Sequence, residues 1–240
     1  MPLSLGDDPA VFAQPLDADL RGTRIGWLGD WNGYLPMEPG ILELCEQALS
    51  GLQAVGCEVD AYRVPFDPAR LWRIWLAHRH LMVGGQFHGL VRDPETRKLV
   101  KPALIWEVEG LDGMTAHQVF QATEERSAWY QTVLAMFQDV DFLAVPTAQV
   151  FPFDAQLDWP KEIAGRSMDT YHRWMETVTP WTLAGCPVIS VPVGFGAAGL
   201  PMGMQLIGPP RGDLAVLRLA HAYEQVRDWV GERSPQGLWG

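Results

Sequence analysis

The chain has 240 residues, with 18 Lys and Arg against 29 Asp and Glu, and a formal net charge of −11. This acidity excludes nucleic acid and anionic membranes as partners, because both bind basic surfaces. With 48% hydrophobic and 20% charged residues, the composition is that of a soluble globular protein and excludes a disordered one.

The first half of the chain predicts a parallel βαβ unit. Residues 1–22 are rich in Pro, Asp and Gly and indicate a lead-in segment, so we expect residues 23–240 to form a single α/β domain. A strand is predicted over residues 23–29, an amphipathic helix over 38–52 and a second strand over 57–64. This strand–helix–strand order favours parallel pairing of the two strands.

Two long helices and a buried strand are expected next. Apolar residues at helical spacing predict a helix from Pro68 to about His88, and a second from Thr115 to Phe137. The charged, Pro-containing segment between them, residues 93–106, indicates a loop. Residues 140–147 (VDFLAVPT) predict a short buried strand that ends at its proline.

The last third begins with an irregular segment. Residues 148–169 contain two prolines and a glycine but no clear periodicity, and a structureless segment of about twenty residues is often a functional loop. Residues 170–185 predict a helix, and residues 212–229 predict an amphipathic helix near the C-terminus.

The stretch VGFGAAGLP, residues 193–201, contains G-x-G-x-x-G, the spacing of a dinucleotide-binding turn. That turn needs a following helix whose free N–H groups hold the pyrophosphate. Here Leu200-Pro201 and a second apolar run, residues 202–208, follow instead. The glycines therefore predict a hairpin between strands 186–193 and 202–208, and no cofactor.

No complete catalytic site is visible. None of the six serines lies in G-x-S-x-G, Ser190 falls inside a predicted strand, and Cys186 is interpreted as a buried thiol. The six histidines show no H-x-x-x-H spacing, so we predict neither a catalytic residue nor a metal site.

The cellular compartment is indicated by the cysteines and the N-terminus. Cys45, Cys57 and Cys186 are odd in number and widely spaced, which suits a reducing compartment. The start MPLSLGDDPA has neither the basic nor the apolar region of a secretory signal. We therefore expect a cytoplasmic protein.

The motifs of the last hundred residues resemble those of a known family. DFLAVPT (residues 141–147), followed by a Pro-containing loop, a helix and GCPVISVPVGFGAAGLPMGMQLIG (residues 185–208), is similar to the C-terminal half of the amidase-signature family. The upstream segment ADLRGTRIGWLGD fits less closely. The resemblance implies an α/β fold with a mixed sheet flanked by helices, and hydrolysis or transfer of amide nitrogen.

The catalytic region of that family has no counterpart in these 240 residues. Family members use a lysine and two serines, with the nucleophile in a Gly/Ser-rich motif, and no position here matches that motif. The resemblance therefore implies the C-terminal portion of an amidase, truncated or split and inactive alone. Its substrate would be a small-molecule amide. Half of a sheet would leave an edge exposed, so a homo-oligomer such as a dimer is possible.

The resemblance also implies a substrate-side wall. In the family, the loop after Pro-Thr and the helix before Leu-Ala-Gly face the acyl group. Trp174-Met175 stands where the amidotransferase members usually carry an Asp, which favours an aryl or alkyl carboxamide over glutamine. The candidate substrate-binding residues, each of which could also be an ordinary buried side chain, are Thr147, Phe151, Trp159, Tyr171, Trp174 and Trp181.

Two other interpretations remain open. One is a non-catalytic binding or scaffolding protein that keeps the amidase half-fold and uses an exposed apolar face as its partner site. The other is an independent hydrolase that uses an acid pair or a histidine, for which no motif is present.

Overall fold

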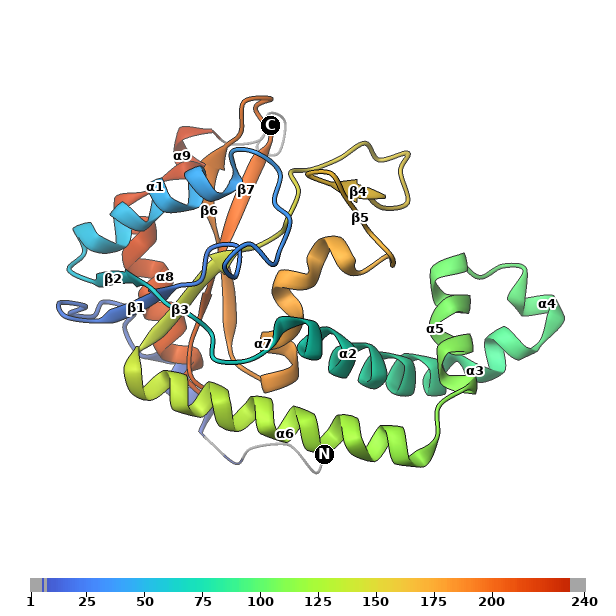
Figure 1. Cartoon of the computed structure of the whole chain (residues 1–240). Coiled ribbons are helices and arrows are strands. Elements are labelled where there is room, and N and C mark those ends of the chain that lie inside the picture. Colours follow the sequence, from blue (N-terminus) through green and yellow to red (C-terminus); the bar gives the residue numbers. More distant parts are fainter. Residues whose placement is uncertain (1–5, 7, 234–240) are drawn as a thin grey trace.

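A five-stranded mixed sheet forms the centre of the molecule (Figure 1). The computed structural model describes residue 6 and residues 8–233. The strand order is β2-β1-β3-β7-β6, with β1 parallel to both β2 and β3, while β7 runs antiparallel to β3 and β6. The predicted mixed α/β sheet is therefore confirmed. The strands are β1 (Arg24–Trp27), β2 (Glu58–Ala61), β3 (Phe142–Pro146), β6 (Val188–Phe195) and β7 (Pro201–Ile207).

Helices cover both faces of the sheet, and each face has its own hydrophobic core (Figure 1). One core contains buried side chains of α1 (Ile41–Ala54) and α8 (Asp213–Val226). The other contains side chains of α2 (Pro68–Arg79), α6 (Ala116–Asp139) and α7 (Thr179–Ala184). The predicted βαβ unit is the part formed by β1, α1 and β2.

Strand β3 belongs to both cores. All five of its residues are buried, and successive side chains of a strand point to opposite faces. Accordingly, Phe142 and Ala144 lie in the core of α1 and α8, whereas Leu143 and Val145 lie in the core of α2, α6 and α7.

The glycine-rich stretch connects β6 to β7 as an antiparallel hairpin, as predicted. Gly194 and Gly199 have φ values of 124° and 74°, which disfavour residues with a side chain. A Cβ on Gly196 would lie 2.7 Å from the ring of Phe151, so the loop packs against that ring only because the residue is glycine.

The predictions between residues 68 and 106 were wrong in two places. The expected continuous helix is divided into α2, a π-helical turn (His80–Gly84) and α3 (Gly85–Arg92). The expected loop contains α4 (Pro94–Arg97) and α5 (Pro102–Asp112). In both helices proline occupies the first turn, where its missing N–H costs nothing, so these prolines start helices and do not break them.

Helices α3, α4 and α5 form an extension beside the body of the molecule, which we call the helical arm (Figure 1). The arm packs closely at its base, where a Cβ on Gly110 of α5 would lie 2.2 Å from Nδ1 of His80. A Cβ on Gly84 would lie 2.9 Å from Cβ of Leu111. Both glycines therefore permit the contact between α5 and the π-helical turn.

Three smaller departures concern the ends of the chain and the irregular segment. The lead-in segment contains a 3-10 helix, Pro9–Ala13, whose first turn is capped by Asp8. The irregular segment contains a two-residue hairpin, β4 (Glu162–Ile163) and β5 (Arg166–Ser167). The last helix stops at Val226 and is followed by the short α9 (Trp229–Glu232).

The predicted helix 170–185 was also only partly correct. It consists of a 3-10 segment, Arg173–Val178, followed by α7. Met175 has non-helical angles (φ −114°, ψ 25°) inside the first segment, and Pro180 lies in the first turn of α7. A proline cannot continue the hydrogen bonding of a preceding helix, which accounts for the new start.

Removal of the Leu143 side chain tests the dependence of the fold on β3. Leu143 is fully buried, so Leu143→Ala is expected to lower the free energy of unfolding by about 2–5 kcal/mol, through lost transfer energy and a residual cavity. The control is Leu99→Ala, because Leu99 is 85% exposed, and it should change stability by less than about 0.5 kcal/mol. Urea titration measures both, and similar losses would contradict the central role of β3.

Candidate functional site

The six predicted wall residues do not form one continuous wall. Thr147 and Trp181 line one cavity, and Trp159 and Tyr171 line another. Phe151 packs against Gly196, and Trp174 packs against Phe153 with ring centroids 5.4 Å apart. Neither Phe151 nor Trp174 lines either of these two cavities.

Thr147 lies just after β3, in a cavity of about 390 Å³ beside β6. Its backbone N–H donates to the carbonyl of Gly203 at 2.9 Å, which fixes the chain as it leaves the sheet. Its hydroxyl lies 2.7 Å from the Ser190 hydroxyl on β6. Trp181 contributes to the lining but is 1% exposed, so most of its indole belongs to the core.

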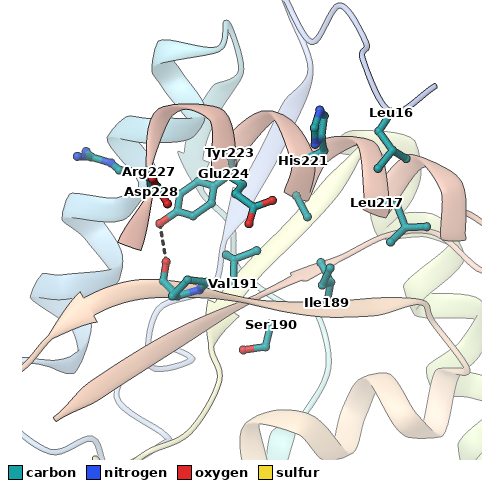
Figure 2. Close-up of a pocket in the computed structure, with 12 residues that line it drawn as sticks. Leu16, Ile189, Ser190, Val191, Leu217, His221, Tyr223, Glu224, Arg227 and Asp228 are labelled. Carbon is teal, nitrogen blue, oxygen red and sulfur yellow. Dashed lines mark hydrogen bonds between the residues drawn. The ribbon is translucent and has the colours of Figure 1, made fainter. Parts of the chain in front are cut away.

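Ser190 points away from the α8 side of the sheet, whereas its neighbours Ile189 and Val191 point toward α8 (Figure 2). On that side they line a groove of about 250 Å³, where the hydroxyl of Tyr223 donates to the carbonyl of Pro192 at 2.9 Å (Figure 2). Among the described residues, the only hydrogen-bond partner of the Ser190 hydroxyl is Thr147. No base contacts this hydroxyl within that part of the chain, which fits the structural role predicted for it.

The larger cavity, which we call the arm cavity, has a volume of about 580 Å³. It opens between the start of α5 and two parts of the irregular segment, residues 158–161 and 169–172. Lys101, Trp106, Trp159, Lys161 and Tyr171 lie in its wall.

The aromatic side chains of the arm cavity are held by their neighbours. The ring of Tyr171 meets that of His172 edge to face, with centroids 4.9 Å apart. Trp106 lies 4.6 Å from His80, and the ammonium of Lys161 lies 3.3 Å from the centroid of Trp159. The wall therefore presents ring surfaces that are already oriented.

A buried carboxylate, Glu107, connects the walls of this cavity. It is 2% exposed, and its Oε1 accepts a hydrogen bond from Arg79 Nε at 2.7 Å and lies 3.0 Å from His172 Nε2. His80 Nδ1 lies 3.1 Å from the backbone carbonyl and 3.4 Å from the carboxylate of the same residue. Burial alone would raise the pKa of Glu107, but hydrogen bonds from His172, His80 and Arg79 outweigh burial and hold that pKa well below its usual range.

Glu176, the acid nearest to the Trp174-Met175 position, has a different environment. Its carboxylate accepts hydrogen bonds from the Tyr34 hydroxyl at 2.8 Å and from Arg173 at 3.1 Å. Burial raises the pKa of Glu176 above its usual value, against the attraction of Arg173. Because these partners occupy both oxygens, Glu176 joins the irregular segment to the residues after β1.

The sequence interpretation missed Lys101, Trp106 and Glu107, because all three lie in or next to the segment predicted as a loop. A usable signal was present: Pro102 starts the run PALIWEVEGLD, which contains good helix formers. The histidines were considered only for metal spacing. Among the described residues, no group of His, Cys, Asp and Glu side chains could hold a metal ion.

Comparisons with known proteins agree with this fold. The Amidase family profile matches residues 4–217. The chain is 26% identical over 241 residues to an acylamidase of Rhodococcus erythropolis, covering 99% of this chain and 49% of the relative. It is 40% identical over 249 residues to a glutamyl-tRNA(Gln) amidotransferase component of Synechococcus sp. (strain CC9605), covering 95% and 50%.

Among solved structures, a bacterial aryl acylamidase of the amidase-signature family superposes with a TM-score of 0.82 at 23% identity, covering 92% of this chain and 46% of that one. This likeness shows the fold. The family match shows more, since it spans most of the sequence: the chain belongs to the amidase family. It spans about half the length of the relatives that it matches. Within the described residues, no helix is long and apolar enough to cross a bilayer.

Replacement of Glu107 tests the buried cluster. Glu107→Gln leaves Arg79 without its carboxylate partner and should lower the free energy of unfolding at pH 7 by about 2–4 kcal/mol. Because folding lowers the pKa of Glu107, the ionised group contributes its full stabilisation above the ordinary value of 4.5 and loses it as the pH falls. The gap between wild type and variant should therefore shrink between pH 7 and pH values below 4.5.

Glu109→Gln is the matched control on the same helix. The Glu109 side chain is 55% exposed and pairs with Arg97, so this variant should lose less than about 1 kcal/mol. Urea titrations of the three proteins at several pH values make the comparison. A gap for Glu107→Gln that stays constant as the pH falls would contradict the assigned ionisation.

Proposed function

We propose that this chain forms the C-terminal half of an amidase-signature hydrolase that cleaves carboxamide C–N bonds, and that it is inactive alone. The observation that supports this most strongly is a family match over residues 4–217 in a sequence with no Ser-Ser-Lys motif. In this proposal the serine nucleophile and the lysine come from a segment outside these 240 residues.

The described residues would supply substrate contacts and not bond cleavage. The aromatic lining of the arm cavity, with Trp159 and Tyr171 from the predicted wall, suits an aryl or extended alkyl group. Thr147 and Trp181, in the cavity beside β6, are the other members of that wall that line a cavity. The three cysteines are free thiols, which supports a cytoplasmic setting.

A second candidate function is binding through the outer edge of β6. In the described part of the chain this strand pairs with β7 alone, so its other edge is unpaired. Val188 on this strand is 39% exposed, and the groove of Figure 2 lies next to it. An unpaired edge with apolar side chains favours pairing with another chain, so a homodimer or a scaffolding partner would fit here.

The test of the proposed function is ammonia release from simple aryl and alkyl carboxamides. The purified 240-residue chain should release none above background, because it has no activated nucleophile. A fusion of the remaining half of the Rhodococcus acylamidase to this chain should restore hydrolysis, and replacement of the catalytic serine of that half with alanine should abolish it.

Sustained ammonia release by the chain alone, unchanged through further purification, would contradict the proposal. Ser190→Ala and Cys186→Ala would then identify the nucleophile. A well-folded fusion that hydrolyses none of the amides would also count against it.

Self-association through β6 is tested by a charge on that edge. If the edge mediates pairing, Val188→Lys should shift sedimentation from dimer to monomer at high micromolar concentration, because a lysine on an edge strand opposes pairing. Val226→Lys is the control, since Val226 is similarly exposed (42%) but lies on α8. A wild-type chain that remains monomeric and binds no hydrophobic dye would exclude this second function.

A further inference from the structure

The lysines of this chain are concentrated at one place. The sequence contains only three, at positions 98, 101 and 161, in a chain with a net charge of −11. Lys101 and Lys161 both line the arm cavity, although they are 60 positions apart in the sequence. Two thirds of the ammonium groups of an acidic protein therefore face one cavity.

The other charges in the wall of the arm cavity are mostly paired. Arg79 is bound to Glu107 at 2.7 Å. Asp169 accepts two hydrogen bonds from Arg173, at 2.9 and 2.8 Å. Among the described residues Lys101 has no charged partner, while Lys161 contacts the face of Trp159. After this pairing, two ammonium groups remain against a single carboxylate, that of Asp158.

The aromatic rings beside these lysines keep surface open to a ligand. Trp106 is 38% exposed and Tyr171 is 36% exposed, although both lie against other rings in the wall. Exposed rings in a concave site of about 580 Å³ provide area for stacking and edge-to-face contacts with a ligand ring. Trp159, under the ammonium of Lys161, completes this set of rings.

The start of α5 lies at the same cavity and adds to its positive potential. Pro102, Ala103 and Leu104, in the first turn of this 11-residue helix, are part of the wall. The N-cap residue, Lys101, makes no side-chain cap hydrogen bond, so it does not neutralise the positive end of the helix. This contribution supports the one made by the two lysines.

We propose that the arm cavity binds an aromatic carboxylate: an aryl ring lies among Trp106, Trp159 and Tyr171, and the carboxylate is held by Lys101 and Lys161. As a statement about substrate this rests on the proposed function, and it narrows the class to amides that carry an aryl group and an anionic group. The binding itself requires no catalysis and can be measured on the chain alone.

The experiment titrates the purified full chain with hippurate, which has a phenyl ring, an amide and a carboxylate. Hippuramide lacks the charge and N-acetylglycinate lacks the ring. Saturation-transfer NMR and calorimetry should show hippurate binding roughly three- to tenfold more tightly than either analogue. The preference over hippuramide should weaken as salt screens the exposed ammonium groups.

Lysine variants locate the interaction. Lys101→Gln with Lys161→Gln should remove the preference for hippurate over hippuramide while leaving hippuramide binding nearly unchanged. Lys98→Gln is the matched control: Lys98 pairs with Glu95 at 2.7 Å outside the cavity, and its loss should leave the preference intact. Circular dichroism confirms that each variant is folded.

Three results would overturn the inference: equal affinity for hippurate and hippuramide, a preference that survives in the double variant, or no binding of hippurate up to about tenfold above the millimolar affinities typical of fragments this small. These are separate from failure of the proposed function. Lysine-dependent binding of hippurate without hydrolysis by the completed enzyme would refute the proposed amidase role alone. Hydrolysis of neutral amides without any anion preference would refute the present inference alone.

Discussion

The arrangement depends on β3, which is bonded on both edges and buried on both faces. It pairs in parallel with β1 and antiparallel with β7, so it joins the βαβ unit to the C-terminal hairpin. This placement also determines where Thr147 leaves the sheet, opposite Gly203. A Cβ on Gly203 would lie 2.7 Å from Ser190 Oγ and 2.9 Å from Thr147 Oγ1, so the hydroxyl pair fits only over a glycine.

The second organising contact is the cluster around Glu107. A buried carboxylate is expensive unless it is paired, and here each of its partners comes from a different part of the fold. Arg79 ends α2, His80 begins the π-helical turn, and His172 lies in the segment before α7. The cluster therefore holds the helical arm and the irregular segment together, and the arm cavity lies between the elements that it joins.

The sheet was predictable because its signals are local. Short β-branched runs marked the strands, and the glycines of residues 193–201 marked the hairpin once no helix followed them. The capped helix starting at Ala116 was equally visible, since Thr115 and Gln118 form a capping box. The site was not predictable, because Glu107 and His172 become meaningful only through partners far away in the sequence. Lys101 and Lys161 likewise meet only after the arm has folded against the irregular segment.

The two edges of the sheet differ in a way that bears on how the half-fold is completed. Edge strand β2 is four residues long and carries Glu58 and Asp60, features that discourage pairing with another chain. Edge strand β6 is twice as long and carries Val188, Ile189 and Val191. Pro192 removes one donor from it, which leaves residues 188–191 as the stretch that a further strand could join. A protected edge on one side and an apolar one on the other indicate that the sheet ends at β2 and is open to continuation at β6.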